Sequence, residues 1–486
     1  MRPRLARPVL AVAGATFALH AALAGRYGFH RDEVYFIACG RHLAFGYADQ
    51  PPLTPLLARL CTALFGDHLV PLRLVAALVH VAIILVAALI ARELGGGRGA
   101  QALAAAAAAA CPYFFGAGSL LATATVDVLV WSVITLLIAR VIVRDDERTW
   151  LWVGVAFGIG LQNKWMPAFF VVYLAVGMLA TADGRRRLRS PWLFGGAAIA
   201  LLLWAPNLIW QATHDWPSFE VMRNNNQAVL ADSGRLRFLP ENVGLLLFLF
   251  PLAVIGWRWL WRDARWRAIA IAVIADVAIQ LVLGGKSYYV GGLYTVLLAA
   301  GAVAVAGAVE RAPRRWLAIA VATGVVSLPF TAPVLPVSAY NAIGGTDINK
   351  ELGEQVGWQE LTDQVVAVYR SLPADQRANL RIIAGTYGEA GAIEIYGPAR
   401  GLPGGIVLSG QNSYHDWWPD DAPTGAVITV RIPLDRLAPL FAGCRQVGTI
   451  TNAEDVHTRD YGLPIGVCDR PLVSPAEIRE ALRIYS

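Results

Sequence analysis

The stretch that decides the fold is "VPLRLVAALVHVAIILVAALIA", residues 70–91, which runs into the arginine-containing segment "ARELGGGR" at residues 91–98. An apolar run of about 20 residues is what an α-helix needs to cross the hydrocarbon core of a bilayer. Arginines beyond the end of such a run are typical of the point where a helix leaves the lipid. The stretch therefore predicts a transmembrane helix.

Similar runs recur on both sides of this segment, and about 11 are long enough, or nearly long enough, to span a bilayer. The chain is 56% hydrophobic and only 16% charged, whereas soluble domains are about 25% charged. The predicted fold is a mainly α, polytopic helical membrane protein. The predicted segments are residues 8–25, 70–91, 101–118, 125–143, 150–162, 165–181, 191–210, 241–260, 268–283, 288–309 and 316–336.

The connections between these segments alternate between arginine-rich and arginine-poor. The stretches "MRPRLAR", "RDDER", "DGRRRLR" and "ERAPRR" all fall on one side. The positive-inside rule makes that side cytoplasmic. The opposite side receives residues 26–69, the first extracytoplasmic loop, and the whole C-terminal part of the chain.

Composition divides the chain into a predicted transmembrane domain, residues 1–336, and a small extracytoplasmic α/β domain, residues 337–486. The second part holds 18 acidic and 12 basic residues, a net charge of −6; because the whole chain carries +6, the first part carries +12. This distribution argues against a nucleic-acid partner. In the second part, "QELTDQVVAVYRSL" and "LDRLAPLFAG" predict helices, and "LRIIAGT", "GIVLSG" and "AVITVRI" predict strands.

Two features leave alternatives open. The N-terminal "RPRLAR", the apolar run after it and "AALA" fit either a cleavable signal peptide or a retained first helix. We expect a retained helix, because the acidic loop that follows needs an anchor. Cys444 and Cys468 either form a structural disulfide or stay buried as free thiols. The five cysteines have no metal-binding spacing.

The candidate catalytic residues lie in "FHRDEVYFIACGRHLAFGYADQPP", residues 29–52, directly after the first apolar segment. Asp32 and Glu33 come first, and Asp49 follows. Burial raises the pKa of a carboxyl group toward the range of a general base, so carboxylates at a membrane surface are candidates for removing a proton. The alternative is that Asp32 and Glu33 cap an interfacial helix, "EVYFIACGRHLAF". Both roles can coexist.

Lysine is rare in this chain, which has only three lysines among 41 basic residues. Lys164 in "LQNKW" and Lys286 in "GGKSYY" both fall at predicted outward edges of the membrane. Ammonium groups at that depth suit a lipid-linked phosphate. The alternative is that each lysine snorkels to the headgroups. Asp127, in "TATVDVLVW", begins a segment on the same face, where it binds an acceptor, pairs with a cation or caps the helix.

Taken together, these motifs resemble bacterial glycosyltransferases of the GT-C superfamily. They are most similar to the glycosyltransferase family 39-like branch, which is related to dolichyl-phosphate-mannose protein mannosyltransferases and lipid A aminoarabinose transferases. Relatives often read Glu-Lys-Pro-Pro where this chain has "DQPP" at residues 49–52. "NKW" at residues 163–165 and "GKSYY" at residues 285–289 resemble the family's lysine motifs.

The resemblance implies an inverting enzyme that takes a sugar from a polyprenyl-phosphate donor on the extracytoplasmic face of the bacterial inner membrane. Asp32 would be the general base and Glu33 a supporting carboxylate. The loss of the family's lysine at position 50 redistributes contacts with the donor phosphate. The residues expected to bind substrate are Asp49, Gln50, Asp127, Lys164, Lys286 and Tyr288.

The acceptor class stays open between protein, lipid and polysaccharide. Some GT-C enzymes bind a divalent cation near the active site, so the resemblance allows one, although no convincing carboxylate–histidine set is present for it. His214–Asp215 in "THDWP" is interpreted as an ordinary loop. A multi-pass transporter or flippase is the alternative function, in which Asp127 and Asp276 would couple ion movement; no internal repeat supports it. A membrane scaffold is a third possibility.

Overall fold

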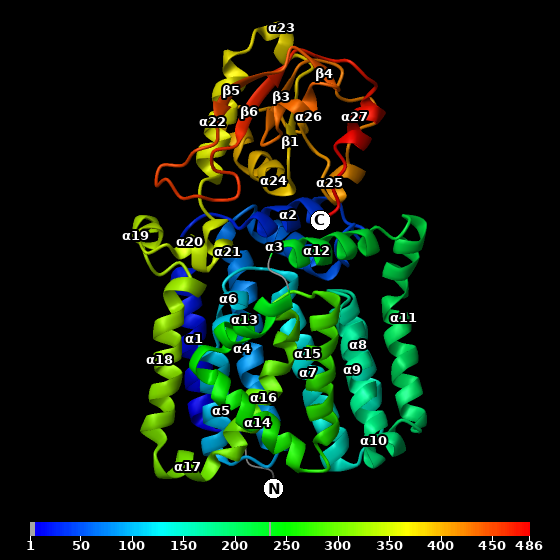
Figure 1. Ribbon diagram of the computed structural model, residues 1–486, viewed down its shortest axis with the longest axis vertical. Helices are drawn as coiled ribbons and strands as arrows, with labels where there is room; N and C mark the ends of the chain where they lie inside the picture. The colour runs from blue at the N-terminus through cyan, green and yellow to red at the C-terminus, as the bar shows by residue number, and fades with distance from the viewer. Residues whose placement is uncertain (1–4, 233–234) are drawn as a thin grey trace.

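A helical bundle and a smaller mixed domain lie one above the other, with a thin layer of helices between them (Figure 1). The computed structural model describes residues 5–232 and 235–486. Within these residues, every strand belongs to the C-terminal domain. The predicted class, a mainly helical membrane protein with a small C-terminal α/β part, is confirmed at this level.

Every apolar segment that the sequence predicts to cross the membrane is helical. The bundle consists of α1 (Arg7–Leu23), α4 (Leu69–Glu93), α5 (Arg98–Ala110), α6 (Pro112–Gly118), α7 (Thr123–Arg144), α8 (Thr149–Leu161), α9 (Met166–Ala180), α11 (Pro191–Thr213), α13 (Phe238–Leu246), α14 (Phe250–Arg262), α15 (Arg267–Leu283), α16 (Tyr294–Ala304) and α18 (Pro313–Thr331). Short turns of 3₁₀-helix precede or join some of these: η1 (Arg235–Arg237), η2 (Leu247–Leu249) and η3 (Ser287–Leu293).

Fewer of these helices meet the length of a full span than the sequence suggests. Within the described residues, five helical segments are long and apolar enough to cross a bilayer, or six if α5 and α6, which meet at a 62° bend, form one span. Helices α1, α8 and α9 are apolar but shorter. A multi-pass membrane protein is therefore confirmed, whereas the count of about 11 spans stays a prediction.

The predicted first extracytoplasmic loop is largely helical rather than open. It contains α2 (Arg31–Arg41) and α3 (Leu53–Phe65). The sequence indicated a helix at α2. It did not indicate α3, because residues 26–69 were interpreted as a loop. In α3, Leu60 is 51% and Leu64 is 74% exposed. An amphipathic helix with an exposed apolar face at the end of the bundle suits the bilayer interface.

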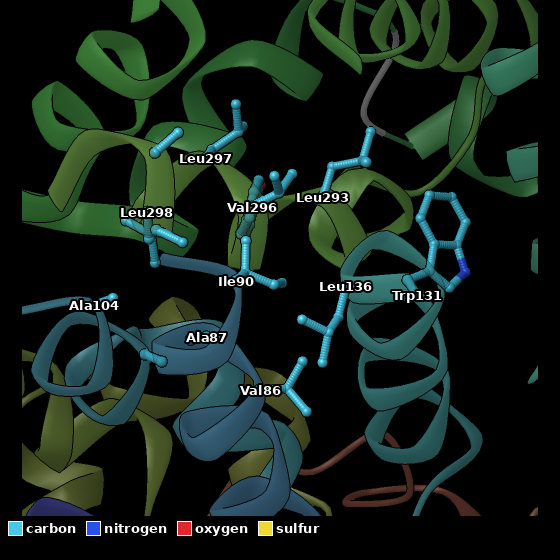
Figure 2. Packing of buried hydrophobic residues seen from close by; sticks show 14 of the residues in the cluster. Val86, Ala87, Ile90, Ala104, Trp131, Leu136, Leu293, Val296, Leu297 and Leu298 are labelled. Carbon is cyan, nitrogen blue, oxygen red and sulfur yellow. The ribbon is translucent and has the colours of Figure 1, made fainter. Parts of the chain in front are cut away.

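The centre of the bundle is packed from α4, α5, α7 and α16 (Figure 2). Val86 and Ile90 of α4 lie close to Leu136 of α7 and Val296 of α16, and all four are buried. Between α4 and α5 the facing residues are mostly alanine, as at Ala104. Small side chains let helix backbones approach closely, which is how helices associate in lipid.

Glycines set the closest helix contacts. A Cβ atom on Gly154 of α8 would lie 2.0 Å from the carbonyl oxygen of Gly196 in α11. A Cβ atom on Gly256 of α14 would lie equally close, at 2.0 Å, to the carbonyl oxygen of Leu297 in α16. Only 11% of the apolar stretch of α11 is buried within the protein. The close contact at Gly196 is therefore an important part of the packing of α11 against the bundle.

The C-terminal domain is built on a five-stranded mixed sheet in the order β2-β1-β3-β6-β5. Strands β1, β2 and β3 run parallel, and β6 is antiparallel to both β3 and β5. Ile382 of β1 pairs with Val407 and Ile428 on either side. The domain contains α22 (Trp358–Ser371), α23 (Ala374–Arg377), β1 (Arg381–Ala384), α24 (Tyr387–Tyr396), η4 (Pro398–Arg400), β2 (Val407–Ser409), α25 (Ser413–Asp416), β3 (Val427–Val430), α26 (Leu434–Leu437), β4 (Phe441–Ala442), β5 (Arg445–Thr449), β6 (Pro464–Cys468), β7 (Arg470–Pro471) and α27 (Pro475–Ala481).

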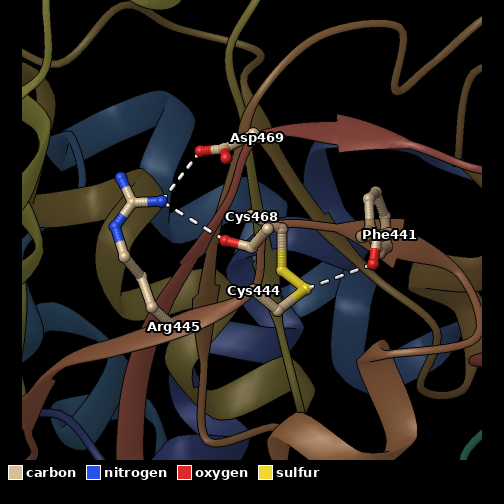
Figure 3. The surroundings of a disulfide bond; sticks show 6 residues. Phe441, Cys444, Arg445, Cys468 and Asp469 are labelled. Carbon is tan, nitrogen blue, oxygen red and sulfur yellow. Dashed lines mark hydrogen bonds and ion pairs between the residues drawn. A yellow bond between two sulfur atoms is a disulfide. The ribbon is translucent and has the colours of Figure 1, made fainter.

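The predicted strands and the first predicted helix of this domain are confirmed as β1, β2, β3 and α22. The second predicted helix, "LDRLAPLFAG", is wrong beyond Leu437, because the chain turns and Phe441–Ala442 pairs with Arg470–Pro471. Cys444 and Cys468 are joined by a disulfide, the first of the two alternatives (Figure 3). Arg445 beside it donates to Asp469 at 2.8 Å.

The remaining helices lie at the two ends of the bundle, and α1 docks on it. Helices α10 (Ala182–Arg187) and α17 (Ala306–Arg311) lie at the end away from the C-terminal domain, whereas α12 (Pro217–Asp232), α19 (Val337–Ala342), α20 (Gly345–Ile348) and α21 (Lys350–Gly353) lie at the end that faces it (Figure 1). The first half of the basic stretch "RPRLAR" lies outside the described residues. Its apolar continuation is α1, where His20 and His80 of α4 approach to 2.9 Å. This packing fits a retained first helix, which stays a prediction.

Candidate active site

The first turn of α2 separates the two acidic residues that follow the first apolar helix. The backbone N–H of His30 donates to Glu33 Oε2 at 2.8 Å, and the N–H of Asp32 donates to His30 Nδ1 at 3.2 Å. This is a capping box in which His30 is the N-cap. Glu33 therefore caps the helix, whereas the Asp32 side chain stays outside the box and is 32% exposed.

Glu33 is fully buried and is held by a buried arginine. Arg73 of α4 lies 3.1 Å from Glu33 Oε2 and donates to carbonyl oxygens in the turn from residue 24 to residue 28. A buried carboxylate is tolerated when it is paired and hydrogen-bonded in this way. The pair fixes the start of α2, and with it Asp32, to the bundle. That geometry suits the supporting role expected of Glu33.

Asp32 is held from the C-terminal domain. Tyr387, the first residue of α24, donates its hydroxyl to Asp32 Oδ1 at 2.9 Å. Arg31 Nε lies 3.6 Å from the same oxygen. The carboxylate keeps exposed surface, so it can reach a proton on an incoming substrate.

Asp49 lies beside this pair and is held by a second tyrosine. Tyr35 of α2 donates its hydroxyl to Asp49 Oδ1 at 2.7 Å, and its ring stacks on Tyr387 with 4.4 Å between the ring centres. Burial raises the pKa of Asp49 to about 7, although the hydrogen bond from Tyr35 opposes that change. Asp49 and Asp32 are also within electrostatic range of each other. The two carboxylates therefore belong to one site.

Gln50 is not brought to this group. Its side-chain amide lies 3.8 Å from Cys39 Sγ, and its backbone carbonyl oxygen accepts a hydrogen bond from the backbone N–H of Tyr47. Gln50 is 4% exposed. It thus stabilises the loop between α2 and α3 from within, and its expected contact with substrate stays a prediction.

The two lysines that the sequence singled out converge on the same region. Lys164, in the turn between α8 and α9, has its Nζ atom 5.1 Å from the ring centre of Tyr288 in η3. Lys286 and Asp127 are within electrostatic range of Lys164. Asp32 is within that range as well. Two ammonium groups thus lie near two carboxylates, and a phosphate group placed beside the lysines would be stabilised by both ammonium groups.

Local contacts position both Lys164 and Asp127. Asn163 accepts from the hydroxyl of Thr54 in α3 at 2.7 Å and donates to the carbonyl oxygen of Thr123 in α7 at 2.8 Å. The turn that carries Lys164 is therefore tied to two other elements. Asp127 accepts a hydrogen bond from the indole N–H of Trp131, one turn further along α7, at 3.2 Å.

Tyr288 lies at the centre of the predicted residues. Asp32, Asp127 and Glu351 all act on it electrostatically. Its ring stacks with that of Tyr113, with 6.1 Å between the ring centres. The side chain is thus within electrostatic range of Asp32, Asp127 and Glu351, and its ring lies 5.1 Å from the Nζ atom of Lys164.

Glu351 is a member of this neighbourhood that the sequence did not indicate. Its Oε2 atom lies 3.2 Å from His30 Nε2, and Arg459 donates to Oε1 at 2.9 Å. Although burial alone would raise it, the hydrogen bond and the charge of His30 hold the pKa of Glu351 well below its usual value. Glu351 is therefore an anion that links Arg459 of the C-terminal domain to His30 at the start of α2.

Tyr387 was also missed, although its sequence carried a usable signal. In "TYGE", residues 386–389, Thr386 and Glu389 form a capping box. That spacing predicts the start of a helix at Tyr387. Nothing in the spacing indicates which other element this helix start faces, so the contact with Asp32 could not be predicted.

Of the two other polar residues that the sequence singled out, His214 lies at the C-terminal end of α11, and Asp276 lies in α15 within electrostatic range of Asp127. His214, predicted to lie in an ordinary loop, is the C-cap residue of α11 and stacks on Trp210 with 4.1 Å between the ring centres. Asp276 is buried in α15 close to Tyr173 of α9 and to Gln280. Within residues 5–232 and 235–486, no three His, Cys, Asp or Glu side chains gather as a metal-binding group.

Comparison with known proteins supports the resemblance drawn from the sequence. Residues 49–210 match the family model described as dolichyl-phosphate-mannose-protein mannosyltransferase. This range contains Asp49, Asp127 and Lys164, and ends before Lys286. No curated protein matches the chain as a close relative.

The fold is similar to those of solved membrane transferases. The crystal structure of ArnT from Cupriavidus metallidurans bound to undecaprenyl phosphate has a TM-score of 0.59 at 17% identity, covering 94% of this chain and 97% of that one. The Archaeoglobus fulgidus oligosaccharyltransferase crystallised with Zn and sulfate has a TM-score of 0.50 at 12% identity, covering 87% and 68%. The mycobacterial arabinofuranosyltransferase AftD also has a TM-score of 0.50, at 14% identity, covering 96% and 40%.

Proposed function

We propose that this chain, a membrane glycosyltransferase related to the dolichyl-phosphate-mannose-protein mannosyltransferases, moves a sugar from a polyprenyl phosphate to an envelope acceptor. The reaction would take place outside the cytoplasm of the bacterial inner membrane, with inversion at the anomeric carbon. One observation carries the proposal: Lys164, whose Nζ atom lies 5.1 Å from the ring centre of Tyr288, is within electrostatic range of both Asp32 and Asp127.

The arrangement supports a single displacement. Asp32 takes the proton from an acceptor hydroxyl or amine as that atom attacks the anomeric carbon. The bond between the sugar and the phosphate oxygen breaks, and the electron pair leaves with the polyprenyl phosphate. Lys164 and Lys286 stabilise the charge that develops on this phosphate. No covalent intermediate with the protein is needed, so the configuration inverts.

The position of the lysines supports a lipid-borne donor. Both lie where bundle helices end, at the ends of α8 and α15, so a phosphate there leaves its isoprenoid chain in the bilayer. ArnT, with a similar fold, was crystallised with undecaprenyl phosphate. The disulfide of the C-terminal domain supports an oxidising compartment on the same side.

Replacing Asp32 with Asn tests the general base. The Asp32→Asn variant should insert and bind polyprenyl-phosphate sugar normally, but its transfer rate should fall about 10²- to 10⁴-fold, because the amide cannot accept the proton. The measurement is transfer of radiolabelled sugar by purified protein to envelope extracts. A variant with full activity would remove Asp32 from this role.

Replacing Lys286 with Ala tests the phosphate site. We expect Lys286→Ala to weaken donor binding and leave acceptor binding nearly unchanged, since the proposal assigns this ammonium group to the donor phosphate. Polyprenyl phosphate titrated into the purified variants gives the affinity directly. Lys350→Ala is the matched control, because Lys350 is an exposed lysine of α21 outside the cluster. Equal affinities in the wild type and the Lys286 variant would indicate a snorkelling lysine instead.

A further inference from the structure

The C-terminal domain contacts both carboxylates of the site. Tyr387 donates directly to Asp32 Oδ1 at 2.9 Å. Ser413, at the start of α25, donates its backbone N–H to the hydroxyl of Tyr35 at 3.3 Å, and this hydroxyl in turn donates to Asp49 at 2.7 Å. Two separate segments of one domain thus meet two acids that are 17 residues apart in the chain.

The same two segments pack closely on α2 and on the loop that follows it. A Cβ atom on Gly388 would lie 3.1 Å from Arg31 Cβ, and one on Gly391 would lie 2.9 Å from Val34 Cβ. At these two glycines, helix α24 therefore lies directly against α2. On the other segment, the backbone N–H of Ala48 donates to Ser413 Oγ at 2.9 Å.

Buried charges inside the domain hold Tyr387 in place. Glu389 is fully buried, closes the capping box on Thr386, and lies 3.2 Å from Arg431. Arg431 also pairs with buried Asp460 at 3.1 Å. This network fixes the first turn of α24.

We propose that the C-terminal domain is a fixed half of the active site, in which Tyr387 orients Asp32 directly and Ser413 orients Asp49 through Tyr35. The proposal rests on the proposed function and adds a role for the domain. Tyr387 is a positioning residue: its hydroxyl holds the base, and its ring, stacked on Tyr35, couples the two acids. The domain is then part of the catalytic centre, with no need to move as a lid.

Tyr387→Phe tests the positioning role. Phenylalanine keeps the ring stacked on Tyr35 and removes only the hydroxyl. A hydrogen bond to a charged group is strong, so its loss should lower kcat roughly 10- to 100-fold. The KM for the polyprenyl-phosphate sugar should not change, because the lysines that face the phosphate are untouched. A merely structural tyrosine would affect both constants, or neither.

Tyr461→Phe is the matched control. Tyr461 belongs to the same domain and donates to Asp455 at 2.8 Å, but on the exposed side. We expect its kcat and KM to equal those of the wild type. The proposal is overturned if Tyr387→Phe keeps the wild-type kcat, or if both variants lose activity alike. The Asp32→Asn variant distinguishes this result from a failure of the proposed function. Full activity in Asp32→Asn would show that Asp32 is not the general base, whatever the Tyr387 variant does.

A cross-link tests whether the domain is fixed, and does not depend on the folding of the Tyr387 variant. In Val34→Cys/Gly391→Cys the two Cβ atoms are close enough for a disulfide after small backbone shifts. The oxidised and reduced forms of this same protein should have equal kcat. If oxidation abolishes turnover and reduction restores it, the domain must move, and the fixed arrangement is wrong.

Discussion

At the residue scale, neighbouring acids in α2 have different roles. Glu33 closes a capping box and pairs with Arg73, whereas Asp32 lies in the site and accepts a hydrogen bond from Tyr387. Both acids can be singled out from the sequence, because carboxylates at a membrane surface are rare. The sequence does not indicate which of the two keeps an exposed carboxylate, because that depends on where α4 places Arg73. The same limit applies to Asp49, whose burial depends on Tyr35.

The titration of Asp49 gives a prediction for stability against pH. Burial raises its pKa from 3.8 to about 7 in the folded protein. The folded state then binds a proton more tightly than the unfolded chain, so this group's contribution to stability is present at low pH and falls as the pH rises from about 4 to about 7. In Asp49→Asn this pH-dependent contribution disappears.

The measurement is the thermal midpoint in detergent across that pH range. We expect the wild type to lose stability relative to Asp49→Asn as the pH rises, with a constant difference above about pH 8. Parallel curves over the whole range would show that Asp49 titrates normally in the folded protein.

At the element scale, long hydrophobic segments predict helices correctly, whereas short amphipathic segments do not. All of the long apolar runs became helices, since each must satisfy its own backbone in lipid. Helix α3 was missed because its 13 mostly apolar residues, interrupted by Thr54, Arg59 and Thr62, are too few to cross a bilayer and lie in a region interpreted as a loop. The helix predicted over "LDRLAPLFAG" failed for a tertiary reason, since its second half pairs with β7 and leads into the disulfide.

Gly154→Leu tests the close contact between α8 and α11. The added side chain would overlap the backbone of Gly196, so the helices must separate, and overpacking of this kind typically costs about 1–3 kcal/mol. We expect a lower thermal midpoint in detergent. Gly14→Leu in α1 is the control, because its Cβ would meet nothing within 4 Å. Equal midpoints for the two variants would show that the contact contributes little.

At the scale of the whole molecule, the site forms where two layers meet. The bundle supplies Asp127 and Lys164, the intermediate layer supplies Asp32 and Asp49, and the C-terminal domain covers them (Figure 1). The transporter alternative predicted that Asp127 and Asp276 act together in the membrane. Asp127 lies within electrostatic range of Asp276 and of Lys164 alike, and it is the family model matched over residues 49–210, one of mannosyltransferases, that favours the enzyme.

The side of the membrane on which the C-terminal domain lies can be measured by labelling. A Cβ atom added to Gly404 in this domain, or to Gly97 at the opposite end of the bundle, would meet nothing within 4 Å. An impermeant thiol reagent on intact cells should label Gly404→Cys, and should label Gly97→Cys only after permeabilisation. The reverse pattern would place the domain in the cytoplasm. Cys39, Cys61 and Cys111 are buried and give little background.

Apolar run length and the positions of the arginines determined from sequence alone that this chain is a multi-pass helical membrane protein with a mixed C-terminal domain. Motif order was enough to indicate Asp32, Asp127, Lys164 and Lys286, since these chemistries are rare beside lipid. Only the tertiary structure decided that Tyr387 holds Asp32. A contact across 355 residues depends on how two layers dock, and no local spacing encodes that docking.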